Sequence, residues 1–343
     1  MKVAVSARII DRNVGGNTRY ARHVHGGEGD YDSVLLRPRR GSSTADYALH
    51  EAFIWPRTTN ADVLHMPADT GAVLRGRIPL VTTVHGLGYR HVSGIRSKRS
   101  QFVWKTRVAA SVRASDAIIT VSDSSASDIM DEFGLSRERV HVIPHGVDPV
   151  FSPGTVSDEE RERLTELGFP DQYLLYLGNL EPRKNLRALI AAAEMAYRDT
   201  GTKLVICGAP AWDFQSILDD IQASSATVYA GRLPEDLLVA AYRGAALFCF
   251  PSKYEGFGLP VLEAMAAGTP VATTRAGSLR EVAEDASFEI SGFDPASIAT
   301  ALRAAMSDET ARAEMTAAGL VRASHYTWAE SLRLHRDVFG GLT

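Results

Sequence analysis

Two glutamates in the second half of the chain stand eight positions apart, in the stretch KYEGFGLPVLEAMAAGTPV. Glu255 and Glu263 enclose a turn of two glycines and Pro260. Glycines let a backbone approach a ligand closely, and the helix start that a proline favours offers free N–H groups to an anion. A solvated turn would explain one acid alone, but two acids around such a turn predict a binding or catalytic site.

A cationic pair, Arg183 and Lys184, occurs earlier, in YLGNLEPRKNLRALIAA. The pair follows an apolar run that is typical of a strand and precedes a helical pattern. An arginine fork and a lysine point charge suit the binding of a diphosphate and its stabilisation as a leaving group. Taken alone, the pair is equally well explained as a charged turn that begins a helix.

The elements that must position these groups alternate along the whole chain. Short β-branched runs alternate with amphipathic stretches, such as residues 17–26 and 98–115, which is the pattern of βα units around a parallel sheet. Strands are predicted at 2–7, 33–37, 62–66, 79–85, 116–122, 139–144, 173–180, 203–208, 227–231, 246–250, 270–274 and 286–290. Since ligands of open α/β sheets bind beyond the carboxyl ends of strands, the loops there are where function is expected.

The stretch FSPGTVSDEE, at residues 151–160, interrupts the alternation with proline, glycine and serine. Such a composition suits a hinge or a domain boundary. We therefore expect an N-terminal Rossmann-like domain at 1–152 and a C-terminal one at 153–325, with a helix at 326–343 that packs back on the N-terminal domain.

The spacing Glu255-x7-Glu263 within EGFGLPVLEAMAAGTPV resembles the signature of retaining glycosyltransferases of family 4, the glycosyl transferases group 1. The resemblance implies an α/β fold of the GT-B type, two Rossmann-like domains with parallel sheets facing a central cleft. It also implies transfer of a sugar from a nucleotide donor, bound mainly by the second domain, to an acceptor bound by the first.

Further stretches match that family in the expected order and extend the resemblance over nearly the whole chain. The glycine turn of VGGNTRYARHV resembles the loop that closes on the donor phosphates, and His85 in TTVHGLG resembles a histidine that contacts the transferred sugar. Many members have His-Asp where this chain has His85-Gly86. His145 in VIPHGVD replaces a frequent asparagine, and the Gly231-Arg232-Leu233 turn resembles the segment that meets the nucleotide base.

The resemblance assigns roles residue by residue. The Glu255 equivalent holds sugar hydroxyls, the Glu263 equivalent holds the ribose, and retention is attributed to a front-face attack assisted by the leaving phosphate. Catalytic roles are implied for His85, Arg183, Lys184 and Glu255. Donor binding is implied for Gly15, Gly16, Arg183, Lys184, Arg232, Leu233, Glu255, Gly256, Phe257, Gly258, Leu259 and Glu263.

The co-substrate implied is a nucleotide sugar, with GDP-mannose favoured by the wording LEPRKN and UDP-sugars kept as the alternative. The acceptor is left open as a saccharide, a lipid-linked or a small-molecule acceptor. No cofactor, no metal and no nucleic-acid partner are expected. Asp30-Tyr31-Asp32 has the D-x-D form of a manganese clamp, but its place in a short loop before a strand favours a solvated turn.

Composition sets the broad class. The chain has 343 residues, 45% of them hydrophobic, and its first ten residues are a short apolar run typical of a strand rather than of a signal peptide. Cys207 and Cys249 lie in apolar runs, where a free thiol behaves as a small hydrophobe. We therefore expect a cytoplasmic protein, with peripheral contact to the inner face of the membrane left open.

Charge is unevenly distributed, and one segment concentrates it. Residues 1–150 carry 20 Lys and Arg against 15 Asp and Glu, whereas residues 151–343 carry 17 against 26. Residues 89–113 hold seven Lys and Arg and no acid, interleaved with Phe102 and Trp104. This pattern is typical of a helix on an anionic membrane or acceptor, and equally of a helix that packs on a sheet with a hydrated basic face.

Three other functions use parts of the same pattern. A glycosidase also needs paired carboxylates, but it has no use for Arg183-Lys184 or a phosphate loop. A dinucleotide oxidoreductase would require G-x-G-x-x-G, which the glycine turn at residues 15 and 16 lacks. A non-catalytic binder of nucleotide sugars would keep every motif, so measured turnover distinguishes it from an enzyme.

Overall fold

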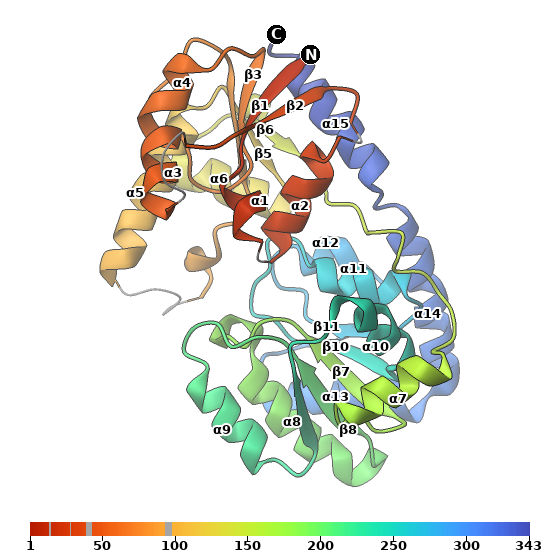
Figure 1. Ribbon diagram of the computed structural model, residues 1–343. Coiled ribbons are helices and arrows are strands. Elements are labelled where there is room, and N and C mark those ends of the chain that lie inside the picture. Colours follow the sequence, from red (N-terminus) through yellow and green to blue (C-terminus); the bar gives the residue numbers. More distant parts are fainter. Residues whose placement is uncertain (14, 28, 39–42, 93–97) are drawn as a thin grey trace. The chain divides into compact units, whose positions relative to one another are not determined.

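The computed structural model describes residues 1–13, 15–27, 29–38, 43–92 and 98–343. Within these residues the chain divides into two compact units (Figure 1). The first unit comprises Met1–Gly146 and Tyr326–Thr343, and the second comprises Val147–His325. Each is described by itself below.

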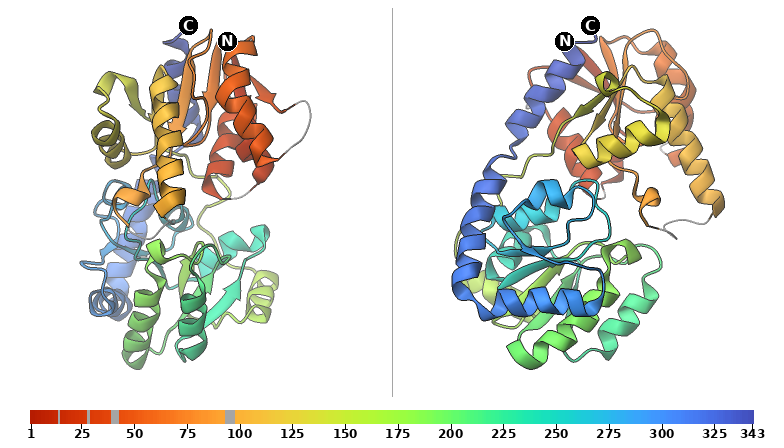
Figure 2. Two further views of the ribbon diagram at one scale, coloured as in Figure 1. Left: turned by 90° about the vertical axis from the view of Figure 1, so that its left-hand side faces the viewer. Right: turned by 180° about the vertical axis from the view of Figure 1, so that it is seen from behind.

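The first unit is built on a six-stranded parallel sheet in the order β2-β1-β3-β4-β5-β6. Its strands are β1 (Lys2–Ser6), β2 (Asp32–Leu36), β3 (Val63–Met66), β4 (Leu80–Val84), β5 (Ala117–Thr120) and β6 (Val140–Val142). The strands β3, β4 and β5 are buried along their whole length, because helices cover both faces of the sheet (Figure 2). This double cover explains their near-continuous apolar sequences.

The helices of the first unit differ in length and regularity. They are α1 (Arg8–Arg12), α2 (Gly16–His25), α3 (Thr44–Leu49), α4 (Trp55–Thr58), α5 (Lys98–Ala114), α6 (Asp123–Phe133) and α15 (Trp328–Gly340). A π-helical turn, His50–Ile54, joins α3 to α4, and single 3-10 turns occupy Gly88–Arg90 and Arg137–Arg139. None of the helices in the described part of the chain is both long enough and apolar enough to cross a membrane.

The second unit repeats the plan with the strand order β12-β11-β10-β7-β8-β9, again entirely parallel. Its strands are β7 (Tyr173–Leu177), β8 (Lys203–Cys207), β9 (Thr227–Gly231), β10 (Leu247–Phe250), β11 (Val271–Thr273) and β12 (Phe288–Glu289). Eleven of these twelve strands fall within runs that the sequence predicts, and β2 begins one residue before its predicted run, so the expected α/β class with two parallel sheets is confirmed.

The helices of the second unit connect its strands and continue to residue 324. They are α7 (Asp158–Glu166), α8 (Leu186–Thr200), α9 (Gln215–Ala223), α10 (Leu238–Gly244), α11 (Leu259–Ala266), α12 (Leu279–Ala283), α13 (Pro295–Ser307) and α14 (Glu309–Ser324). Single 3-10 turns occupy Pro182–Lys184 and Glu235–Leu237. The helix α8 packs against α9 and α13, and α11 packs against α14.

The division between the units falls at residues 146/147 rather than at the expected 152/153. The ring of Phe151 packs edge-on against Tyr242, with centroids 5.8 Å apart, and Arg243 Nε donates to the carbonyl of Ser152 at 2.8 Å. These contacts attach the segment after Gly146 to the second unit. The proline and serine composition that suggested a hinge therefore belongs to a segment that packs within the second unit.

The helix α15 completes the core of the first unit, although more than 180 residues separate it from that unit's other elements. It packs against α2, and Trp328 and Phe339 are buried in one cluster with Val3, Val5 and other strand residues (Figure 1). At 6% and 0% exposure, these two side chains are as buried as the strands they contact. The core of the first unit is therefore assembled from both ends of the sequence.

A chain of buried hydrogen bonds also ties α15 to the sheet. Its members, in order, are Ser33 Oγ, His25, His65, Thr83 Oγ1, Tyr20 OH, His335 and the carbonyl of Ser331, at distances of 2.7–3.0 Å. The carbonyl of Ser331 can only accept, so His335 carries its proton on Nδ1 and accepts from Tyr20 through Nε2. Burial keeps all three histidines neutral, so each earlier member must donate to the next one.

Acidification is expected to destabilise the first unit. Burial lowers the pKa of His25 to about 3 and that of His335 to about 4, from an ordinary value of 6.5, and it also lowers the pKa of His65. Because the unfolded chain binds these protons more readily, stability is complete above pH 6.5 and falls as the pH drops toward 4. At pH 5 the loss is about 2 kcal/mol for each of His25 and His335.

Melting temperatures measured from pH 7.5 to pH 5 test this prediction. His335→Gln retains a hydrogen-bonding side chain that does not titrate in this range, so its melting temperature should vary less with pH than that of the wild type. Equal pH dependence in the two proteins would show that the histidine chain does not determine the acid sensitivity.

Candidate active site

The candidate site residues of the second unit follow two strands that are neighbours in the sheet. Strand β10 pairs with β7, with Phe248 opposite Leu175. The cationic pair lies in the loop after β7, and Glu255 lies in the loop after β10. Since parallel neighbours end at the same edge of a sheet, the two loops meet there.

Arg183 and Lys184 both bind Glu255. Lys184 Nζ donates to Glu255 Oε1 at 2.7 Å, and Arg183 Nη1 lies 2.9 Å from Oε2 of the same carboxylate. Lys184 Nζ also lies 4.6 Å from the centroid of the Phe250 ring, a cation–π contact at the end of β10. The sequence predicted cations that face a ligand, whereas the structure has them largely buried and paired with an acid.

A second carboxylate completes this cluster. Arg183 Nη2 donates to Glu181 Oε1 at 2.5 Å, and the indole N–H of Trp212 donates to Glu181 Oε2 at 3.0 Å. Arg183 Nη1 also donates to the carbonyl of Tyr254 at 2.6 Å. Sequence analysis did not single out Glu181, although its place two residues before the pair was a usable signal. Nothing in the sequence pointed to Trp212.

The opposite charges of the cluster stabilise one another's ionised forms. Burial alone would raise the pKa of Glu255, but Arg183 and Lys184 hold it at about 2. Burial alone would lower the pKa of Arg183, but Glu255 and Glu181 raise it above its usual value. Burial lowers the pKa of Lys184, and Glu255 opposes part of that shift. Arg183 and Glu255 are therefore both charged at neutral pH.

The loop that carries Glu255 is fixed by its backbone. Ser278 Oγ donates to the carbonyls of Glu255 and Phe257, at 3.0 and 2.6 Å. Gly277 has a φ of +59°, and a Cβ there would lie 2.6 Å from the carbonyl oxygen of Glu255. Gly258, with a φ of +106°, precedes α11. The glycines thus permit a backbone course that other residues would strain.

Helix α11 begins and ends as its sequence predicts. Leu259 is its first residue, Pro260 lies in its first turn, and Gly268 follows it with a φ of +81°. Glu263 lies one turn into the helix, 4% exposed, with Oε2 3.1 Å from the Tyr242 hydroxyl that donates to it. An ordinary surface glutamate would not be buried against a tyrosine, so Glu263 has a defined partner inside the unit.

The other expected donor residues occupy varied positions. Gly256 is half-buried, whereas Phe257 is buried. Arg232 is exposed and Leu233 is buried, in the turn after β9, the edge strand two places from β7. The structure therefore groups Arg183, Lys184 and Glu255 in direct contact and leaves the expected base-binding turn further along the same sheet edge.

The expected residues of the first unit follow β1 and β4. Gly15 caps α2 with a φ of +77°, and Gly16 is the first residue of that helix. His85 follows β4, and its backbone N–H donates to Asp69 Oδ1 at 2.8 Å. Its Nε2 donates to the carbonyl of Pro67 at 3.2 Å, while within the described residues Nδ1 has no hydrogen-bond partner. The neutral ring thus retains an acceptor nitrogen, and burial lowers its pKa.

His85 has aromatic neighbours that sequence analysis did not link to it. The ring of Tyr20 meets it edge-on with centroids 4.9 Å apart, and the ring of His145 lies 5.7 Å away. His145 is buried, next to Trp328 of α15. The histidine that stands where relatives often have asparagine is therefore part of the packing around His85.

The D-x-D residues lie before and at the start of β2. Asp30 pairs with Arg336 of α15 at 2.9 Å, Tyr31 donates its hydroxyl to the carbonyl of Val24, and Asp32 begins β2. Across the described residues, no three His, Cys, Asp or Glu side chains are grouped as metal ligands.

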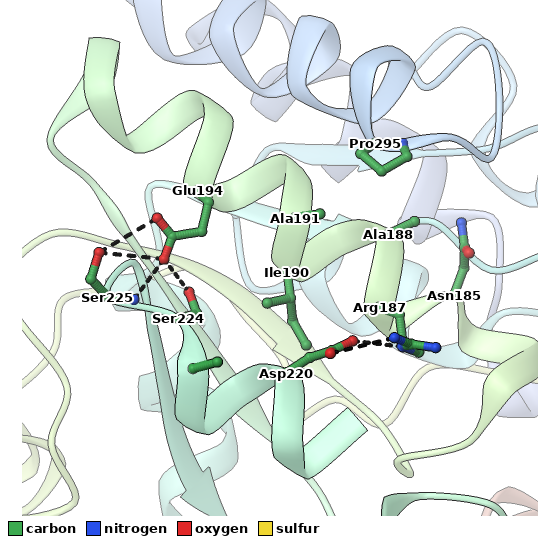
Figure 3. Close-up of a pocket in the computed structure, with 11 residues that line it drawn as sticks. Asn185, Arg187, Ala188, Ile190, Ala191, Glu194, Asp220, Ser224, Ser225 and Pro295 are labelled. Carbon is green, nitrogen blue, oxygen red and sulfur yellow. Dashed lines mark hydrogen bonds and ion pairs between the residues drawn. The ribbon is translucent and has the colours of Figure 1, made fainter. Parts of the chain in front are cut away.

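A separate groove of about 850 Å³ lies along α8 and α9 in the second unit (Figure 3). Its charged side chains already have partners. Arg187 pairs with Asp220 at 2.6 Å, and Glu194 accepts from Ser224 at 2.7 Å. None of the residues expected to bind the donor lines this groove.

Two units, each built on a parallel six-stranded sheet, have the architecture of the GT-B fold. The chain belongs to the family described as glycosyl transferases group 1, whose profile matches residues 159–321, and the profile described as Glycosyltransferase Family 4 matches residues 8–151. The family membership that the sequence motifs suggested is thereby confirmed.

Curated relatives and solved structures agree with this assignment. The chain is 29% identical over 257 residues to O-antigen chain mannosyltransferase B of Escherichia coli, covering 72% of this chain and 66% of that protein. It is 30% identical over 305 residues to D-inositol 3-phosphate glycosyltransferase of Acidothermus cellulolyticus, covering 80% and 67%. The chain thus spans about two thirds of the length of these relatives.

Solved structures match over the whole chain. Sucrose-phosphate synthase of Thermosynechococcus elongatus has a TM-score of 0.77 at 18% identity, covering 99% of this chain and 100% of that one. Anabaena HepE, in complex with UDP and glucose, has a TM-score of 0.74 at 16% identity, covering 100% of each chain. These likenesses establish the fold.

Proposed function

We propose that this glycosyltransferase is a retaining hexosyltransferase that moves a sugar from a nucleotide diphosphate sugar to an acceptor. The observation that carries the proposal is the cluster in which Arg183 and Lys184 converge on Glu255. Two buried cations at one sheet edge can bind a diphosphate and stabilise the charge it gains when the glycosidic bond breaks. GDP-mannose is the first candidate donor, since one relative is a mannosyltransferase, and a UDP-sugar is the second.

The roles follow the chemistry of each group. Glu255 holds hydroxyls of the transferred sugar, Glu263 holds the ribose, and the turn at Arg232 and Leu233 contacts the base. From the first unit, the amides at Gly15 and Gly16 bind phosphate, and Nδ1 of His85 accepts a hydrogen bond from a sugar hydroxyl. The leaving phosphate takes the acceptor proton in a front-face attack, so catalysis rests on positioning and charge stabilisation.

The charge state of Glu255 does not suit the general acid of a glycosidase. Both of its oxygens bind cations, which hold its pKa at about 2. A general acid in a glycosidase needs a raised pKa so that it carries a proton near neutral pH. Glu255 carries no proton there.

The proposal is tested by a thermal-shift panel of nucleoside diphosphates and nucleotide sugars, followed by transfer assays with the donor that binds. A ligand that binds the native state raises its melting temperature. NMR of the product reports the anomeric configuration. An inverted product would overturn the retaining assignment, and binding without turnover on any acceptor would favour a non-catalytic binder of nucleotide sugars.

Transfer is expected to proceed without a metal ion. The two cations take the role that manganese plays in D-x-D enzymes. Asp30 is paired with Arg336, and Asp32 begins strand β2. The initial rate should be unchanged in excess EDTA. Loss of activity in EDTA with recovery on adding manganese would contradict this expectation.

For the acceptor, we propose a saccharide, a lipid-linked or a small-molecule acceptor, with peripheral membrane contact through the basic segment. Residues 93–97 of that segment lie outside the described residues. In α5, Val108 and Val112 are buried against the sheet, as the packing alternative predicted, but Phe102 is 72% and Val103 is 51% exposed. An exposed aromatic beside Arg99 and other basic residues suits an anionic bilayer surface.

Sedimentation with phosphatidylglycerol vesicles checks this contact. Binding should fall severalfold when Phe102 and Val103 are both changed to serine, because apolar burial and charge act together. Phosphatidylcholine vesicles, which carry no net charge, are the control. Equal sedimentation of the wild type and the double variant would remove α5 from the contact.

A further inference from the structure

Two carboxylates bind one guanidinium in the candidate site, and their second oxygens have different partners. Glu255 uses one oxygen for Arg183 and the other for Lys184. Glu181 uses one oxygen for Arg183 and the other for the indole N–H of Trp212. Glu255 thus bridges both cations, whereas Glu181 joins one cation to the neutral indole of Trp212.

The charges decide what a nucleotide must displace. With Glu181 and Glu255 in place, the two cations already face two acids. A diphosphate that approached this arrangement would meet cations whose charge the two carboxylates already neutralise. It would also be repelled by whichever carboxylate lay nearer to it. Strong binding requires one carboxylate to leave. Glu255 is the one that occupies both cations, so it lies where the phosphate oxygens must bind.

Glu181 is unsuited to leave. It lies at the start of the 3-10 turn Pro182–Lys184, where the N–H of Lys184 donates to its carbonyl at 3.1 Å. Its side chain is buried and bonded on both oxygens, to Arg183 and Trp212. Its contact with Nη2 orients the guanidinium while Nη1 faces Tyr254 and Glu255. A fixed arginine loses less side-chain freedom when it binds a ligand.

We propose that Glu181 is a positioning residue that keeps Arg183 in place, and that Glu255 is an internal counterion which the diphosphate of the nucleotide displaces. This inference rests on the proposed function. The displaced carboxylate becomes free to accept hydroxyls of the transferred sugar. The acid that binds the sugar is therefore released only when the diphosphate has taken its place on Arg183 and Lys184.

Two substitutions that remove the same charge test the proposal with opposite expected signs. Isothermal titration calorimetry with GDP and with UDP measures the affinity of each variant. Glu255→Gln removes the competing anion, so the better-bound nucleotide should bind about threefold more tightly or better. Glu181→Gln removes the group that orients Arg183, so binding should weaken about tenfold. Trp212→Phe should weaken binding in the same direction but less.

The matched control is Glu330→Gln, which removes an acid from an exposed ion pair with Arg333 in α15 and should leave affinity unchanged. Melting curves confirm that each variant is folded. If a folded Glu181→Gln protein binds the nucleotide as tightly as the wild type or more tightly, Glu181 does not position Arg183 and the proposal is wrong. It is also wrong if Glu255→Gln weakens binding, since no displacement then occurs. If the wild type binds neither GDP nor UDP, nor the other nucleoside diphosphates of the panel, the proposed function itself fails.

Discussion

Replacing Arg183 or Lys184 with alanine is expected to lower kcat/KM roughly thirtyfold to a thousandfold. This corresponds to a loss of about 2–4 kcal/mol in transition-state stabilisation, the scale for removing one group that stabilises developing charge. The diphosphate gains charge as the glycosidic bond breaks, so preorganised cations interact more strongly with the transition state than with the intact donor. Steady-state kinetics with the identified donor measure the effect. Arg183→Lys should recover part of the loss, because the charge remains while the bidentate fork is lost.

Stability must be separated from catalysis in these variants, because each leaves Glu255 with one partner fewer. Removing one member of a buried ion pair is itself destabilising. Kinetics are therefore measured well below the melting temperature of each variant. Arg187→Ala is the matched control, since Arg187 is exposed and pairs with Asp220. Folded alanine variants at Arg183 and Lys184 with wild-type turnover would refute the diphosphate role.

Glu255→Gln is expected to lower kcat by about a hundredfold, the scale of losing one preorganised group at the reacting sugar. Glu263→Gln is expected instead to raise KM, because Glu263 is assigned to the ribose, which does not change during the reaction. The two changes are chemically identical and both acids are buried in the second unit. The separate effects on kcat and KM therefore distinguish their roles.

The same two variants also distinguish a ribose-binding role of Glu263 from a structural one. Burial of Glu263 beside Tyr242 is also what a structural acid would show, and that role would lower the melting temperature without raising KM. Wild-type kinetics in both variants would contradict the motif interpretation as a whole.

The strands could be predicted from the sequence because their signal is local. LVIC in β8 and LVTTV in β4 are unbroken apolar and β-branched runs, and both are buried in the structure. The signal for the boundaries of α11 was equally local, since Pro260 and Gly268 mark its two ends. Arg183, Lys184 and Glu255 could likewise be placed in the loops after their strands.

What could not be predicted depends on strand order. Arg183 and Glu255 are 72 positions apart, and they meet because β10 lies beside β7 while β8 and β9 lie on the other side. Periodicity does not specify that order. The partners Trp212 and Tyr242, and the direction of the histidine chain, likewise depend on tertiary packing, and a single sequence carries no signal for it.

The return of α15 to the first unit has a consequence for the order in which the protein folds during synthesis. Trp328 and Phe339 belong to a core whose other members include Val3 and Val5. The ribosome must therefore add the roughly 180 residues of Val147–His325, which takes about 10–40 s at typical elongation rates, before that core can close. The second unit is contiguous and can fold within that interval. The half translated first is thus the half completed last, and its apolar surface must be kept from aggregating while the ribosome finishes the chain.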